Sequence, residues 1–146
     1  TMAERMIGAL AELGVEHALV FYGHDGLDEL TTTTTSTVFE LRDGSIRRSD
    51  VDPVSLGLPR VERGALAGGD IAGNAEAVHR VLGGQAGPLR DVAALNAAAA
   101  IVVAGLADDL AGGLALATTA IDDGRAAATL DSFVRTSVAA REAEAA

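Results

Sequence analysis

Three carboxylates lie within five residues of one another, at Asp25, Asp28 and Glu29. They follow an apolar run at 18–22 and share their segment with two glycines. Hard divalent cations such as Mg²⁺ take oxygen ligands, usually one or two carboxylates together with substrate phosphates and water. The adjacent pair Asp28 and Glu29 could hold one such ion through water, or two ions. Spacing alone leaves a solvated acidic turn open as the alternative.

Histidines and threonines near the acidic segment offer weaker candidates. His24 could act as a base or contact a phosphate, but no nucleophile accompanies it, which favours a polar turn residue. The run Thr31–Thr35 could supply hydroxyls to a phosphate, although an extended segment facing a sheet edge is the better interpretation. His17 and His79 are isolated and lack the spacing of a zinc site.

Four polar residues farther along the chain have two interpretations each. Arg90 and Asp91, at a predicted helix start, could pair with each other or with a neighbouring loop. Asn74 and Asn96 fall on predicted helices, where asparagine is unfavourable, so we expect hydrogen bonds to nearby backbone or a role at a domain junction. The segment 68–70 superficially resembles a phosphate loop but fits an ordinary helix entrance.

The elements that must position these residues begin with a helix and a strand. Apolar residues at helical spacing over 2–13 predict a helix that ends at Gly14. Ala18–Tyr22 then predicts a strand buried on both faces of a parallel sheet, with the acidic loop at its carboxyl end. No N-cap is recognisable before this first helix, so we expect residues upstream of Thr1.

An antiparallel hairpin and four helices follow. Thr37–Leu41 and Ile46–Arg48 predict strands joined by a tight turn at Asp43-Gly44, which gives the sheet an antiparallel edge. After a connector over 51–63, helical patterns cover 71–82, 88–104, 110–121 and a segment around 130–134 that frays into an Ala/Glu tail. Asp70 is expected to cap the first of these helices.

These elements do not make a complete α/β domain, because a parallel strand needs parallel neighbours and a helical cover. The predicted fold class is therefore α/β, as an incomplete C-terminal portion of a mainly parallel sheet with an antiparallel edge, followed by a helical half. Residues 1–146 form one such partial domain.

Composition narrows the classes of partner. The net charge is −10, and all 11 basic residues are arginine, so long-range electrostatics disfavour nucleic acid and anionic membranes. The most apolar stretch, 95–107, is too short to span a bilayer and predicts a buried core helix. The absence of cysteine is consistent with a cytoplasmic protein. Abundant small residues and few aromatics favour close packing between helices.

Taken together, five motifs carry a family resemblance. They are G-x-D-G-L-D-E-L at 23–30, G-G-D-x-x-x-N-A at 68–75, V-L-G-G followed by G-P-x-R-D over 81–91, L-N-A-A at 95–98, and I-D-x-G at 121–124. Their order and spacing resemble the anthranilate phosphoribosyltransferases over nearly the whole chain. The run Thr31–Thr35 is similar to the actinobacterial branch.

The resemblance implies an enzyme that transfers the phosphoribosyl group of phosphoribosyl pyrophosphate to the amine of anthranilate, in tryptophan biosynthesis. It implies Mg²⁺ as cofactor, with Asp28 and Glu29 as the metal-binding pair, and a homodimer. Physically, the pair would hold a cation against the pyrophosphate as it leaves. The resemblance assigns no catalytic residue and no other cofactor-binding residue to this chain.

The chain also departs from the family. Tyr22 stands where the family has histidine, and the histidine is displaced to His24. The glycine-rich pyrophosphate loop, the Lys-His-Gly-Asn segment and the anthranilate-binding arginine lie N-terminal in the family and are not among these residues. We therefore expect the N-terminal portion of the same protein to be a partner, and residues 1–146 alone to be inactive.

Three alternatives stay open. A pyrimidine nucleoside phosphorylase of the same architecture would use phosphate as its nucleophile. A non-catalytic relative that binds nucleic acid is disfavoured by the acidic charge. A structural domain whose acidic loop binds no metal would show no response to Mg²⁺ or Mn²⁺.

Overall fold

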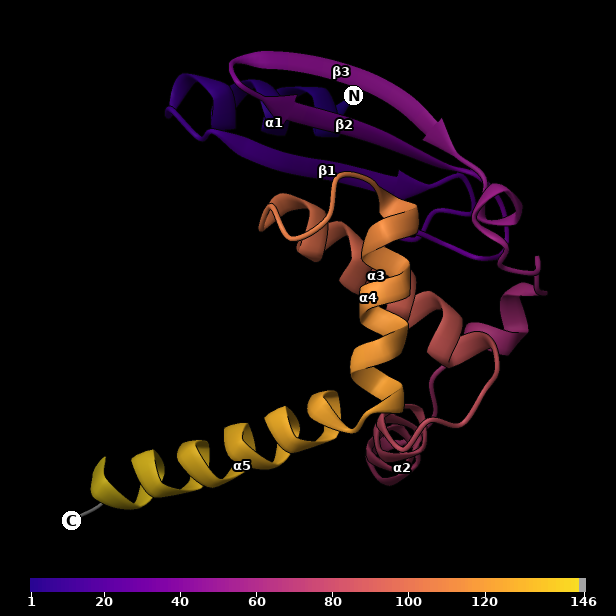
Figure 1. The fold of residues 1–146 in the computed structure, drawn as a ribbon, viewed down its shortest axis with the longest axis vertical. Helices are drawn as coiled ribbons and strands as arrows, with labels where there is room; N and C mark the ends of the chain where they lie inside the picture. Colours follow the sequence, from indigo (N-terminus) through magenta and orange to yellow (C-terminus); the bar gives the residue numbers. More distant parts are fainter. Residues whose placement is uncertain (145–146) are drawn as a thin grey trace.

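The computed structural model describes residues 1–144 as a mixed α/β fold, a three-stranded antiparallel sheet followed by four helices (Figure 1). The elements are α1 (Met2–Glu12), β1 (His17–Gly23), β2 (Ser36–Arg42), β3 (Ser45–Val51), the 3₁₀ helices η1 (Pro53–Leu56) and η2 (Arg63–Leu66), α2 (Ile71–Leu82), α3 (Pro88–Val103), α4 (Leu110–Asp122) and α5 (Arg125–Glu144). The predicted order of helix, strands and helices is confirmed.

The first helix has an N-cap, contrary to the expectation from sequence. The Thr1 hydroxyl accepts a hydrogen bond from the Glu4 amide at 3.2 Å, and the Glu4 side chain bonds back to the Thr1 backbone. This reciprocal arrangement is a capping box, which satisfies two backbone donors at the helix start. Only the expectation of a missing N-cap was wrong, because Thr1 itself is the cap.

The sheet is antiparallel throughout the described residues, in the order β1-β2-β3. The predicted hairpin between β2 and β3 is confirmed, with positive φ angles at Asp43 (50°) and Gly44 (75°). The parallel pairing expected for Ala18–Tyr22 is absent among residues 1–144, because β1 pairs antiparallel with β2 from His17 to Gly23. A run of apolar residues indicates a covered strand but not the direction of its neighbour.

Helices cover both faces of β1, as the apolar run predicts. Val20 packs toward α1, in a cluster that includes Ile7 and Leu41. Leu19 and Phe21 pack on the opposite side, toward the cluster around Leu95 of α3. The β1 side chains are nevertheless only half-buried, because β1 lies at the edge of the sheet in this part of the chain.

The close helix packing expected from small residues occurs between α3 and α4. A Cβ atom added at Gly113 of α4 would lie 2.6 Å from the Ala98 carbonyl oxygen of α3. That separation is impossible for a real side chain, so the two backbones approach closely only because Gly113 is glycine. Ala94, Ala117 and Ile121 complete this buried interface.

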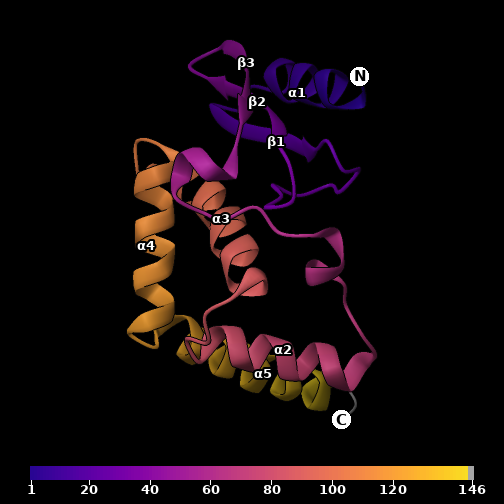
Figure 2. The same ribbon diagram turned by 90° about the vertical axis from the view of Figure 1, so that its right-hand side faces the viewer.

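The helices α2 and α5 contact each other at the end of the molecule opposite the sheet (Figure 2). Asp70 caps α2 as predicted, accepting from the Gly73 amide at 2.8 Å. The apolar stripes predicted for both helices do not become core, since neither helix has a buried residue, and Ile71 is 91% exposed. Nor does the last helix fray after 134, since α5 continues to Glu144.

None of the helices within residues 1–144 combines the length and the apolarity that a bilayer crossing requires. The stretch 95–107 falls largely in α3, where Leu95, Ala98, Ala99 and Val102 are buried. The prediction of a core helix there is confirmed.

Candidate functional site: an acidic loop held by α3

The acidic segment forms the loop between β1 and β2, and backbone hydrogen bonds close its base. The Gly23 amide donates to the Leu27 carbonyl oxygen at 2.8 Å, and the His24 amide donates to the Thr35 carbonyl oxygen at 2.9 Å. The loop therefore leaves and re-enters the sheet at one point. Its conformation is set by the side chains inside it.

Asp25 organises the interior of the loop. Its carboxylate accepts from the Leu27 amide at 3.1 Å, from the Thr31 hydroxyl at 2.8 Å and from the Thr33 hydroxyl. Burial raises the pKa of this carboxyl, but the bonds from Thr33, Leu27 and Thr31 outweigh burial, and the net effect lowers the pKa. Asp25 is thus an ionised acceptor occupied by the protein itself.

Gly23 makes this arrangement possible. A Cβ atom at Gly23 would lie 2.4 Å from Asp25 Oδ1 and 2.9 Å from the Thr31 methyl carbon. Any larger residue at the end of β1 would displace the Asp25 carboxylate from the threonines. The sequence marked this glycine only as a loop residue, because the contact depends on how the loop folds back.

The threonine run is neither a strand nor an edge-facing segment. Thr31 and Thr32 are 1% and 0% exposed, and the run forms bends and no strand before β2 begins at Ser36. The hydroxyls of Thr31 and Thr33 both donate to the Asp25 carboxylate, a group of the protein itself. The interpretation of an extended edge segment was wrong, because the hydroxyls find a carboxylate only six and eight residues away.

Asp28 and Glu29 behave differently from Asp25. Both are exposed, and no hydrogen bond or ion pair within residues 1–144 engages either carboxylate. Within that range, no group of three or more His, Asp or Glu residues forms a metal cage. The two free, adjacent carboxylates fit a cation that takes its remaining ligands from phosphate and water, the usual manner of Mg²⁺.

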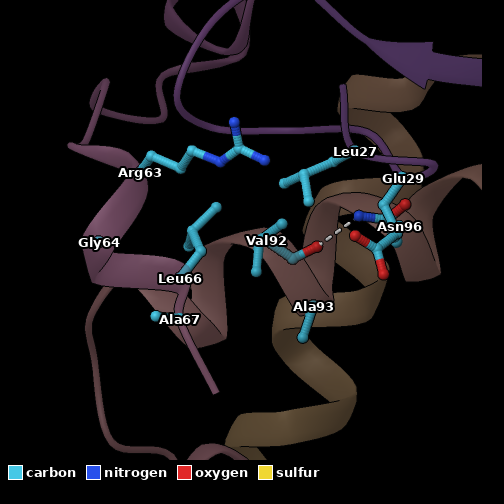
Figure 3. A pocket seen from close by; sticks show the side chains of 9 residues that line it. All are labelled: Leu27, Glu29, Arg63, Gly64, Leu66, Ala67, Val92, Ala93 and Asn96. Atoms are coloured by element: carbon cyan, nitrogen blue, oxygen red, sulfur yellow. Dashed lines mark hydrogen bonds between the residues drawn. The ribbon is translucent and has the colours of Figure 1, made fainter. Parts of the chain in front are cut away.

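Glu29 stands on the wall of a cavity of about 620 Å³ between the loop, η2 and α3 (Figure 3). Val92 and Ala93 of α3 form part of its lining, and Arg63 extends from η2 toward Leu27 (Figure 3). The cavity thus has an apolar lining with an anionic and a cationic side chain on its walls. A ligand with phosphate groups could approach Glu29 from this side.

Asn96 of α3 also lines this cavity and binds the loop directly. The Leu30 amide donates to Asn96 Oδ1 at 2.9 Å, and Asn96 Nδ2 donates to the Leu30 carbonyl oxygen at 2.8 Å. Asn96 Nδ2 also donates to the Val92 carbonyl oxygen at 2.9 Å. The backbone bonds expected for this asparagine are confirmed, but its partner lies 66 residues away and was not predicted.

His24, at the base of the loop, contacts β2 through Thr37. Its Nε2 lies 2.9 Å from the Thr37 hydroxyl, which itself donates to Asp50 at 2.8 Å. Because that hydroxyl hydrogen is directed at Asp50, His24 Nε2 must be the donor. Tyr22, at the family's histidine position, packs instead with the α1 cluster. The structure therefore places no imidazole where the family pattern has one.

The other polar candidates have structural partners. Arg90 donates to the Gly84 carbonyl oxygen at 2.9 Å and to Asp122 at 2.7 Å, so it pairs with neighbouring segments and not with Asp91. Burial raises the pKa of Asp91, and the positive charge of Arg90 opposes that rise. Asn74 accepts from the Gly69 amide at 2.8 Å, which makes 68–70 the helix entrance that was expected.

Comparison with known proteins decides the family. Residues 1–127 match the glycosyl transferase family, a/b domain. The chain belongs to this family. Among relatives, the anthranilate phosphoribosyltransferase of Maricaulis maris is 55% identical over 84% of this chain and 36% of its own length. That of the actinobacterium Thermobifida fusca is 49% identical over 94% of this chain and 41% of its own length.

Solved structures agree with this a/b domain assignment. Anthranilate phosphoribosyltransferase from Thermus thermophilus matches with a TM-score of 0.82 and 35% identity, over 91% of this chain and 39% of its own. The Saccharomyces cerevisiae enzyme, solved with PRPP and Mg, matches at 0.81 and 23% identity, over the same shares of the two chains, which shows likeness of fold. The chain spans about two fifths of the length of these proteins. The predicted resemblance, including its actinobacterial members, is confirmed.

Proposed function

We propose that this chain carries the metal-binding loop of a Mg²⁺-dependent anthranilate phosphoribosyltransferase. The reaction transfers the phosphoribosyl group of phosphoribosyl pyrophosphate to the amine of anthranilate and releases pyrophosphate, in tryptophan biosynthesis. The observation that carries the proposal is the different bonding of the three carboxylates in the loop. Asp25 is bound internally, whereas Asp28 and Glu29 are exposed and unpaired within residues 1–144.

The two exposed carboxylates would hold the cation next to the pyrophosphate. Mg²⁺, when bound, supplies positive charge that stabilises the negative charge developing on the leaving group. Asp28 and Glu29 need transfer no proton for this role, because they act as ligands. Asp25 and the threonines keep the loop in one conformation, so that its ordering need not accompany substrate binding.

The charge of the protein makes a local cation more important. The net charge is −10, and phosphoribosyl pyrophosphate is itself strongly anionic, so approach to an acidic loop is unfavourable without a counter-ion. A divalent ion on Asp28 and Glu29 would neutralise their two negative charges next to the cavity. Arg63, on the cavity wall, would add to that effect.

The finer fold prediction also belongs to this proposal. The outer edge of β1 has no strand partner among residues 1–144, and an apolar cavity of about 480 Å³ lies between β1 and α3, lined in part by Leu19, Phe21 and Val103. We expect the N-terminal portion of the protein to extend a mainly parallel sheet from this edge. The homodimer and the cytoplasmic location stay predictions.

The test follows anthranilate fluorescence in the intact protein, supplied with phosphoribosyl pyrophosphate and Mg²⁺. The variant Asp28→Asn/Glu29→Gln removes two carboxylate charges from the loop. Glu142→Gln/Glu144→Gln removes the same charge from the exposed end of α5 and serves as the matched control. We expect rapid consumption in the parent and the control, and a large loss in the loop variant that excess Mg²⁺ does not restore.

The outcomes separate the claims. Equal activity in parent and loop variant would keep the enzyme but exclude Asp28 and Glu29 as the metal pair. A folded parent that consumes no anthranilate would exclude the proposed reaction. Phosphate-dependent release of a pyrimidine base would then identify the nucleoside phosphorylase.

A further inference from the structure

We infer that Asn96 is a positioning residue for the acidic loop, which it holds through the backbone of Leu30. The inference rests on the proposed metal role of Asp28 and Glu29 and names the part of the fold that orients them. Asn96 does not reach either carboxylate through any hydrogen bond within residues 1–144. It acts through the residue that directly follows Glu29.

The hydrogen bonds of Asn96 leave its amide little freedom. Its Oδ1 accepts from the Leu30 amide, one Nδ2 hydrogen is donated to the Leu30 carbonyl oxygen, and the other to the Val92 carbonyl oxygen. The bond to Val92, four residues earlier in the same helix, fixes the side-chain orientation. The reciprocal pair with Leu30 then fixes both backbone polar groups of one loop residue, as a neighbouring strand would.

Packing reinforces the same contact. The Leu30 side chain is 1% exposed and lies in the cluster with Leu95, the residue next to Asn96, and with Ala99. The helix α3 therefore holds Leu30 by its side chain and by its backbone. The buried side chain fixes the position of Leu30, and the hydrogen bonds to Asn96 fix the direction of its peptide groups. The two together resist rotation as well as displacement of this residue.

The two metal-binding candidates lie between two anchors. Asp25 fixes the Leu27 end of the segment 27–30 by accepting from the Leu27 amide and the threonine hydroxyls. Leu30, held by Asn96, fixes the other end. Asp28 and Glu29 are exposed on the short segment between them. Loss of Asn96 would leave Leu30 held by its side chain alone, with its peptide groups free to rotate, so that Asp28 and Glu29 would lose a fixed orientation.

Groups that orient metal ligands contribute strongly to affinity even without touching the metal. Removal of such a partner typically weakens metal binding by about 10–100-fold. The variant Asn96→Ala is expected to fold, because alanine is a better helix former than asparagine. A second variant, Asn96→Asp, keeps one acceptor but places negative charge against the carbonyl oxygens of Leu30 and Val92. It should weaken binding at least as much.

The experiment measures Mn²⁺ binding to the intact protein in the presence of inorganic pyrophosphate, by electron paramagnetic resonance. Hydrogen–deuterium exchange of the peptide that contains Leu30 is measured on the same samples without metal. Asn74→Ala is the matched control, because Asn74 makes a similar pair of bonds to the backbone of Gly69 on another helix. We expect Asn96→Ala to raise the Mn²⁺ dissociation constant about 10–100-fold, to expose the Leu30 amide to exchange, and to exceed the control on both counts.

Three results would overturn the inference or its basis, each with a different signature. Unchanged exchange at Leu30 in Asn96→Ala would show that Asn96 does not hold the loop. Faster exchange with unchanged Mn²⁺ affinity would show that it holds the loop without positioning the ligands. A parent whose Mn²⁺ binding equals that of Asp28→Asn/Glu29→Gln would overturn the proposed metal site. The exchange result would still show whether Asn96 holds the backbone of Leu30.

Discussion

The helices α3 and α5 are both long and rich in alanine, yet they occupy opposite extremes of burial. Five residues of α3 are buried, among them Leu95 and Ala98, whereas α5 has no buried residue over its 20 described positions. The helix α3 contacts the sheet cluster through Leu95, the acidic loop through Asn96 and α4 through Ala98. Alanine content therefore says little about burial, and position in the fold decides which helix supports the site.

The largest expected effect comes from breaking the α3–α4 contact. Gly113→Ala places a Cβ atom 2.6 Å from the Ala98 carbonyl oxygen, so the helices must separate, and we expect a loss of about 1–3 kcal/mol in the free energy of unfolding. Gly8→Ala in α1 is the matched control, because its Cβ meets nothing within 4 Å. There, the gain in helix propensity should stabilise the protein by about 0.5–1 kcal/mol. Urea unfolding followed by circular dichroism compares the two.

If both alanine variants stabilise the protein, the helices are not in the close contact described. If both destabilise it, the expected gain in helix propensity at Gly8 is wrong, and the loss at Gly113 cannot be assigned to the contact with Ala98. Only opposite signs support α3 as the packed centre of this part of the molecule.

A smaller effect, with a characteristic pH dependence, is expected at Asp25. Asp25→Asn weakens the charge-assisted bonds from Thr31, Thr33 and the Leu27 amide, at a cost of about 1–2 kcal/mol near neutral pH. The folded pKa of Asp25 lies below the unfolded value, so its contribution is complete above the unfolded pKa and disappears as pH falls through the folded pKa. The stability difference between parent and variant should therefore be constant above about pH 5 and shrink in acid.

Asp28→Asn is the internal control for that measurement, since its carboxylate has no protein partner within residues 1–144. Its unfolding curve should follow that of the parent at every pH. A stability difference for Asp25→Asn that grows on acidification would contradict the assigned hydrogen bonds.

Local signals in the sequence predicted most elements, because a turn or a cap involves only neighbouring residues. Asp43-Gly44 indicated its hairpin, and Asp70 indicated the start of α2. Local spacing left Asp28 and Glu29 open between a metal pair and a solvated acidic turn, and only the family resemblance selected them as the metal pair, a role that stays a prediction. Local patterns also failed where a partner decides the outcome, as for Ile71, whose helix stripe indicates an apolar face but not a neighbour to cover it.

The support of the acidic loop could not be predicted by the same means. The contact between Leu30 and Asn96 joins positions 66 residues apart, and no periodicity encodes it. The role of Asp25 depends on Thr31 and Thr33 folding back beneath it, although β-branched residues favour extended backbone. Hydrogen bonding to the Asp25 carboxylate outweighed that preference. The sequence therefore offered Asp28 and Glu29 as candidates, but it did not predict the contacts of Asp25 and Asn96 that support their loop.

The smallest expected effect on stability comes from a substitution on α5, which tests the difference in burial between α5 and α3. Phe133 is 69% exposed, so Phe133→Ala should change the free energy of unfolding by less than about 0.5 kcal/mol, although it removes a whole aromatic ring. Gly113→Ala, which adds only a methyl group at the contact with α3, is the reference and is measured by urea unfolding under the same conditions. A loss above about 1 kcal/mol for Phe133→Ala exceeds what an exposed side chain contributes. Such a loss would show that this ring is covered in solution and that α5 is not the peripheral helix described.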